Sequence, residues 1–127
     1  MTQNTASASA LLRRWQRLHL LIRCALQHDD PALVRQYLAC GTLLTRRAAL
    51  APIPTQRRML ELLLQTAADP ALPWFWRSVC LEHTTQPLAR LSALLRPHDP
   101  LAFAALEDAV AAVTGALPVN ASAARSG

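Results

Sequence analysis

The segment 11–26, LLRRWQRLHLLIRCAL, constrains the fold most strongly, because its apolar residues recur at steps of three and four. This spacing places them along one face of an α-helix. The face consists of Leu11, Trp15, Leu18, Ile22 and Ala25. Further leucines flank it at Leu12, Leu20, Leu21 and Leu26. Together they make an apolar surface wider than one neighbouring helix can cover, so the segment is predicted to be a helix with two packing partners.

The rest of the chain continues this helical pattern, with prolines between the segments. Further helices are predicted at 31–49, 55–68, 73–96 and 99–116, the one at 73–96 being broken near Pro87. The segment 59–64 has almost no polar face, so the helix at 55–68 is expected to be the most buried. With three glycines and abundant Leu, Ala and Arg, the composition favours helix over sheet. The predicted fold is all-α, an up-and-down helical bundle of four to five helices.

Two local signals refine this prediction. Three Asp-Pro pairs occur, at 30–31, 69–70 and 99–100. Each is expected to open a helix, because Asp is a good N-cap and Pro is tolerated at the first helical position. Gly41 stands inside the helix predicted at 31–49, at a cost of about 1 kcal/mol relative to Ala. Its position indicates a close crossing with a neighbouring backbone.

Chain length and tails indicate one domain. The bundle is expected to span 10–117, between flexible tails at 1–9 and 118–127. The N-terminus lacks the pattern of a signal peptide, and the most apolar window, 100–119, carries Glu107 and Asp108 at its centre, so no membrane span is predicted. Three cysteines, an odd number within helical patterns, fit a reducing compartment. We therefore expect a cytoplasmic protein.

Catalytic motifs are missing from the sequence. A phosphate-binding glycine loop cannot be written with three glycines, and four of the eight acidic residues are explained by helix capping and the helix dipole. The protein is therefore predicted to be no enzyme and to need no cofactor. A zinc site of two cysteines and two histidines is an alternative for Cys24, His28, Cys80 and His83. Burial of cysteine in the core is the preferred interpretation, so no metal is predicted.

An aromatic cluster suggests a surface for another protein. Trp74, Phe75 and Trp76 are consecutive, and successive helix residues point about 100° apart, so at least one ring should lie at a rim. The alternative is that two rings enter the core while the third caps the bundle end. Tryptophan and arginine are enriched in interface hot spots. The predicted partner-binding residues are Trp15, Leu20, Leu21, Trp74, Trp76 and Arg77.

Positive charge is concentrated in the first half of the chain. Residues 1–60 carry nine arginines against two acids, whereas residues 61–127 carry four arginines against six acids. A basic patch is predicted at Arg46, Arg47, Arg57 and Arg58, although solvated helix ends would explain the same residues. We do not expect nucleic acid as the partner, because the aromatic residues lie elsewhere in the sequence. Another protein is the expected partner, and a homodimer would also use such surfaces.

Residues 14–95 resemble the flagellar export chaperones of the FliT type. The resemblance rests on Arg14-Trp15-Gln16-Arg17 followed by an aliphatic run to Ile22, on the break at Pro52-Ile53-Pro54, and on the closing segment LARLSALL at 88–95. It implies a cytoplasmic bacterial chaperone of a type III export system, without an active site, that holds one secreted subunit. In that family the C-terminal helix can cover the binding surface, and residues 103–117 would be its counterpart. Pro70, Pro73 and Pro87 depart from the family's smoother helices.

The sequence thus leaves two functions open. The first is an export chaperone that holds a secreted subunit through an apolar helical surface, since a partner helix can complete such a surface. The second is a helical regulator or adaptor that binds a transcription factor or another acidic partner through the arginine-rich half.

Overall fold

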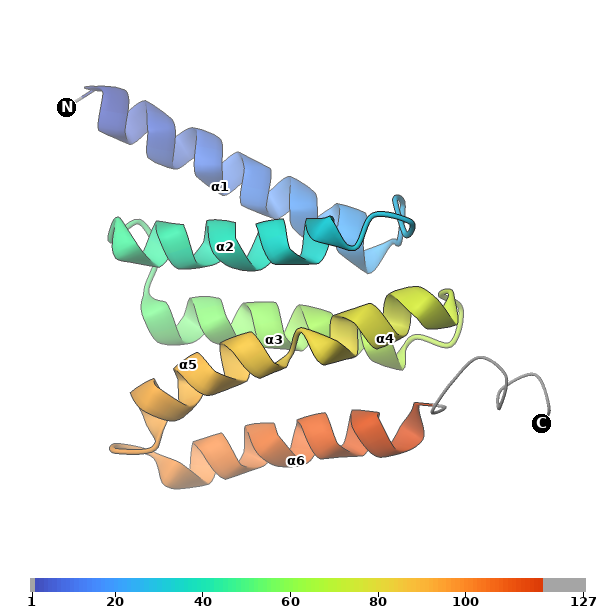
Figure 1. Cartoon of the computed structure of the whole chain (residues 1–127). Helices are drawn as coiled ribbons and strands as arrows, with labels where there is room; N and C mark the ends of the chain where they lie inside the picture. The colour runs from blue at the N-terminus through green and yellow to red at the C-terminus, as the bar shows by residue number, and fades with distance from the viewer. Residues whose placement is uncertain (1, 118–127) are drawn as a thin grey trace.

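A computed structural model describes residues 2–117, which form six helices and no strand (Figure 1). The helices are α1 (Thr2–Arg23), α2 (Ala32–Arg46), α3 (Pro52–Ala68), α4 (Trp74–Glu82), α5 (Thr85–Leu95) and α6 (Pro100–Ala116). The predicted all-α bundle is confirmed. Helices α4 and α5 are the two halves of the broken helix expected at 73–96.

Helix α3 is the centre of the bundle, as its sequence predicted. It packs against all five other helices, and it contributes residues to two hydrophobic clusters. The larger cluster contains residues of α1, α2, α3 and α4, and α3 contributes Met59, Leu62 and Leu63 to it. The smaller cluster consists of Leu60, Leu91, Leu95 and Phe103, from α3, α5 and α6. The polypeptide is therefore organised around one helix, whose exposed side carries Arg58, Glu61 and Gln65.

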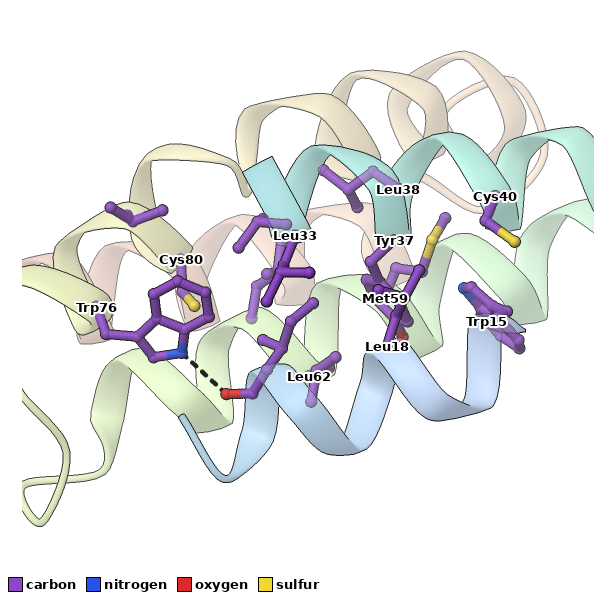
Figure 2. Close-up of a cluster of buried hydrophobic side chains, with 14 of the residues drawn as sticks. Trp15, Leu18, Leu33, Tyr37, Leu38, Cys40, Met59, Leu62, Trp76 and Cys80 are labelled. Carbon is purple, nitrogen blue, oxygen red and sulfur yellow. Dashed lines mark hydrogen bonds between the residues drawn. The ribbon is translucent and has the colours of Figure 1, made fainter. Parts of the chain in front are cut away.

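The larger cluster confirms the apolar face predicted for the first helix. Trp15, Leu18, Ile22 and Ala25 are buried, and Leu11 is half-buried against them. Figure 2 shows Trp15 and Leu18 on α1 among Tyr37, Met59 and other labelled side chains of the core.

Gly41 lies in this core and marks a close approach, as expected, but to side chains rather than to a backbone. A Cβ atom at position 41 would lie 2.8 Å from Trp15 Nε1 and would also collide with the sulfur of Met59. Only a residue without a side chain lets α2 approach the Trp15 indole and the Met59 thioether this closely.

Two helix ends differ from the prediction. Helices α1 and α2 end at Arg23 and Arg46, short of the expected ends at 26 and 49. After each end an alanine adopts a left-handed backbone, with φ of 52° at Ala25 and 58° at Ala48. Each turn closes through a hydrogen bond to a carbonyl five residues earlier, 3.1 Å from Leu26 N to Leu21 O in the first case. Glycine normally marks such turns, so alanine concealed them in the sequence.

The Asp-Pro pairs behave differently from one another. Asp99 is the N-cap of α6, and its carboxylate accepts a hydrogen bond from the Ala102 N–H at 3.1 Å. Asp30 accepts from the Ala32 N–H at 3.2 Å just before α2. The prediction for Asp69 was wrong, because this residue ends α3 and α4 begins only at Trp74. Its carboxylate instead forms an ion pair with Arg23 at 2.9 Å, which joins α1 to the end of α3.

Prolines lie in the first turns of their helices. Pro52 opens α3, so the helix begins earlier than the expected residue 55, and Pro87 lies in the first turn of α5. Backbone N–H groups of a first turn have no intrahelical partner, so proline loses nothing there. The break between α4 and α5 accordingly precedes Pro87.

The two ends of the chain were expected to be tails. Helix α1 already begins at Thr2, inside the expected tail 1–9, while the expected tail 118–127 lies outside the described residues.

Helix α6 faces the two clusters with its apolar side chains Phe103, Leu106, Val110 and Val113, whereas Glu107 and Asp108 are exposed.

Candidate partner-binding surface

A groove of about 410 Å³ runs between α1 and α2. Three leucines form its apolar floor: Leu18 and Leu33 are buried, and Leu21 is half-buried. The polar rim consists of Arg13, Arg14, Arg17 and Gln36, all of which are exposed. The groove therefore combines an apolar floor with a positively charged border.

Helical spacing explains how the groove forms. Arg14, Leu18 and Leu21 follow one another at steps of four and three along α1, so they lie on one side of the helix. Helix α2 returns antiparallel after the turn at residues 24–31 and supplies Leu33 and Gln36. The Arg14 guanidinium donates a hydrogen bond to Gln36 Oε1 at 3.1 Å, which links the two sides of the rim.

Exposed apolar residues lie on the same helix and just after it. Leu20 is 61% exposed and Leu26 is 66% exposed, whereas most large apolar side chains of the bundle are buried. Helix α1 is an edge helix that packs mainly on α2 and α3 (Figure 1). The predicted candidates Leu20 and Leu21 are therefore accessible to a partner, Leu20 to a larger extent than Leu21.

The C-terminal helix does not cover this surface. Helix α6, the counterpart of the helix that can cover the binding surface in FliT-type chaperones, here packs on α5 and α3, at the edge of the bundle opposite to α1 (Figure 1). The smaller cluster explains the difference: Phe103 packs with Leu60, Leu91 and Leu95, which draws α6 to that side.

Trp15 belongs to the core rather than to the accessible surface, which corrects its prediction as a partner contact. It is 5% exposed, and its ring stacks on Tyr37 at 5.6 Å between centroids. The Arg58 guanidinium lies 5.7 Å from the Trp15 ring centroid, a cation–π contact. Among the described residues, Trp15 Nε1 is the one buried side-chain nitrogen or oxygen without a hydrogen-bond partner. The tight fit around Gly41 explains why no acceptor reaches it.

The aromatic cluster at 74–76 divides between core and surface. Trp76 is fully buried, and Arg77 Nε donates a hydrogen bond to the Ala67 carbonyl oxygen at 2.8 Å. Both residues were predicted to contact a partner, and the structure instead gives them internal contacts. Trp74 is half-buried, and Phe75, which was not among the candidates, is 51% exposed. Sequence spacing showed that one ring must lie outside the core, but it could not indicate which one.

The four arginines of the predicted basic patch have different surroundings. Arg58 lies over Trp15, whereas Arg46 lines a second groove between α2 and α5. Arg47 is exposed at the end of α2, and Arg57 is half-buried. The arginines that border these two grooves are Arg13, Arg14, Arg17, Arg35, Arg46 and Arg90. Sequence analysis missed Arg90 as a site residue, since its proximity to α2 depends on how α5 packs.

Titratable groups in the core are perturbed by their surroundings. Burial raises the pKa of the Cys80 thiol to about 12 and also raises the pKa of Tyr37. Burial, together with the positive charges of Arg58 and Arg23, lowers the pKa of His19. The hydrogen bond from Arg23 lowers the pKa of Asp69.

Candidate metal ligands do not form one cluster. Cys24 is exposed and Cys80 is fully buried. His28 Nδ1 lies 3.3 Å from the Ala25 carbonyl oxygen, and His83 Nδ1 lies 2.8 Å from the Val79 carbonyl oxygen. Residues 2–117 contain no group of three or more His, Cys, Asp or Glu side chains that could hold a metal ion. In the same part of the chain, no helix is long and apolar enough to pass through a membrane.

Comparison with protein families, curated proteins and solved structures found no match to this chain.

Proposed function

We propose that the protein is a non-enzymatic binding module that holds an amphipathic helix of another protein against the groove between α1 and α2. The observation that carries this proposal is an apolar floor bordered by arginines on an edge helix. A partner helix can place its apolar stripe on Leu18, Leu21 and Leu33 while its flanking acidic residues approach the rim.

Leucine burial would supply most of the binding energy. Covering a fully exposed leucine contributes about 1.5–3 kcal/mol, so Leu20 and the accessible part of Leu21 are the strongest candidate contacts. The arginine rim would mainly orient the partner helix and speed its association, and it would contribute less to the affinity.

The resemblance to FliT-type chaperones suggests which partner to expect. On that basis the partner is a secreted subunit of a type III export system, which the protein holds in the cytoplasm until export. Because α6 packs away from α1, the proposed surface is open without a rearrangement of the C-terminal helix.

Affinity capture from the native host, followed by mass spectrometry at low and high salt, tests this proposal. We expect one retained protein that survives high salt, because apolar contacts are not screened. The variant Leu20→Ser/Leu21→Ser should no longer capture that protein. The single variant Leu20→Ser, which changes an exposed position, should capture less of it. The matched control Leu101→Ser changes an exposed leucine on α6 and should retain it.

Circular dichroism and thermal unfolding of the three variants separate loss of binding from loss of folding. Equal capture by the wild type, Leu20→Ser and the double variant would exclude the α1 surface as the binding site. Recovery of a secreted subunit or an export component would support the chaperone function, whereas a regulator in its place would favour the adaptor.

A further inference from the structure

A second groove, of about 500 Å³, lies between α2 and α5 above one end of α3, and the proposed function does not use it. Its polar lining comes from three helices. Arg35, Thr42 and Arg46 belong to α2, Gln56 to α3, and Gln86 and Arg90 to α5. None of the described residues that line it is acidic.

The three arginines are available for an external anion. Arg35, Arg46 and Arg90 are all exposed, and within residues 2–117 the structure contains no ion pair that involves them. Arg35 and Arg46 lie on one side of α2, three helical turns and roughly 16 Å apart along its axis. Arg90 lies across the groove on α5, one turn from Gln86. Positive charge therefore borders an elongated groove on both sides.

The floor of this groove is partly polar, unlike the leucine floor between α1 and α2. Gln56 is only 3% exposed, and its Nε2 donates a weak hydrogen bond to Thr42 Oγ1 at 3.4 Å. The apolar lining residues include the buried Leu38 and Pro87. A bound segment would meet a shallow apolar strip between charged and amide side chains.

We infer that this groove binds an acidic segment of a partner protein, with carboxylates spaced along it that pair with Arg35, Arg46 and Arg90. Charge complementarity selects an anion, and guanidinium groups bind carboxylates through paired hydrogen bonds. The spacing of Arg35 and Arg46 favours an elongated ligand over a single phosphate. Among residues 2–117, no aromatic side chain lines the groove. Single-stranded nucleic acid is usually held by stacking on aromatic rings, so the lining favours a polypeptide.

This inference does not depend on the proposed function. It concerns a different groove, a different pair of helices and contacts that salt should weaken. The two grooves can therefore be tested separately, and a failure of one leaves the other standing.

The experiment titrates the full-length protein with a capped helical peptide of roughly 15 residues, composed of Glu and Ala and about 22 Å long. The same peptide with Gln in place of Glu is the uncharged control. Calorimetry gives affinity and stoichiometry, and amide chemical shifts give the location. One Glu peptide should bind per chain, with shifts concentrated in α2 and α5, and the Gln peptide should not bind. Binding should weaken as salt is raised.

Two double variants with the same change in net charge test whether the peptide binds this groove specifically. The alternative is that the overall positive charge of the protein attracts it. Arg35→Gln/Arg90→Gln should lower the affinity for the Glu peptide by about tenfold, because two exposed ion pairs with the peptide are lost. Arg47→Gln/Arg96→Gln, at exposed positions that line neither of the two grooves, should change affinity by less than about twofold.

An equal loss of affinity in both double variants would overturn the inference, since peptide binding would then depend on net charge alone. It would also be overturned if shifts lay outside α2 and α5, or if inorganic phosphate or a single-stranded oligonucleotide bound this groove while the Glu peptide did not. Circular dichroism confirms that both variants keep their helices, which is expected because all four arginines are exposed.

Discussion

The indole N–H of Trp76 donates a hydrogen bond of 2.9 Å to the backbone carbonyl oxygen of Ile22, although the two residues lie 54 positions apart. Figure 2 shows this bond as a dashed line within the core. The carbonyl belongs to the last turn of α1, and it also accepts a hydrogen bond from the Ala25 N–H at 3.1 Å. Trp76 therefore joins α4 to the end of α1 as well as filling the core.

Replacement of Trp76 by Phe should lower the free energy of unfolding by about 2–4 kcal/mol, because a buried hydrogen bond is lost and a cavity is left. Chemical denaturation measures this change. Phe75→Leu, one residue away at a half-exposed position, is the control and should stay within about 0.5 kcal/mol of the wild type. A Trp76→Phe variant as stable as the wild type would contradict the structural role of the bond.

Glycine-to-alanine substitutions should act with opposite signs at two positions. Gly41→Ala places a methyl group against Trp15 and Met59, and overpacking of about 1–3 kcal/mol should exceed the helix-propensity gain of about 1 kcal/mol. Gly115→Ala meets no atom within 4 Å, so it should stabilise α6 by up to about 1 kcal/mol. Thermal unfolding of both variants checks the prediction. Stabilisation at position 41 would show that Met59 can move aside without cost.

Ala48→Gly should stabilise the protein by about 0.5–1 kcal/mol. Ala48 is exposed and has a φ of 58°, which glycine adopts without the penalty of a Cβ atom. The control is Ala39→Gly, at an exposed position within α2, which should destabilise by about 1 kcal/mol. If both substitutions destabilise equally, the left-handed turn after α2 is not formed in solution.

Thiol reactivity should distinguish the three cysteines. Cys24 is exposed, whereas burial raises the pKa of both Cys40 and Cys80, which disfavours the reactive thiolate. A thiol reagent at mildly alkaline pH should therefore modify one cysteine rapidly in the native protein and all three in denaturant. Cys24→Ser should remove the rapid phase and Cys40→Ser should retain it. A rapid phase that persists in Cys24→Ser would mean that the core opens easily.

Stability should fall as the solution is made mildly acidic. The pKa of His19 is lowered in the folded protein from its ordinary value of 6.5, so the unfolded chain binds more protons in this range. The contribution of His19 to the free energy of unfolding is fully present above about pH 6.5. It is lost as the pH falls through the pKa of His19 in the folded protein. His19→Gln should flatten the dependence of the unfolding free energy between about pH 7.5 and about pH 5. An unchanged slope would assign the effect to another group.

Much of the bundle was predictable because it depends on local patterns. The stripe of α1, the central position of α3 and the N-cap at Asp99 follow from spacing and capping rules that need only a few neighbouring residues. The turns after α1 and α2 were misplaced because Ala25 and Ala48 occupy positions where glycine is the usual signal. The arginine clusters were not predictable in their final form, since Arg35 and Arg90 meet across a groove only after α2 and α5 pack.

The sequence by itself determined that the chain is helical, which faces of α1, α3 and α6 are apolar, and that one ring among Trp74, Phe75 and Trp76 must leave the core. Only the tertiary structure decided that Trp76 is buried and Phe75 exposed, that Asp69 pairs with Arg23, and that α6 packs away from α1. The physical reason is that helical periodicity is a property of residues within a few turns. The choice of neighbour depends instead on how apolar faces from distant segments bury one another most completely.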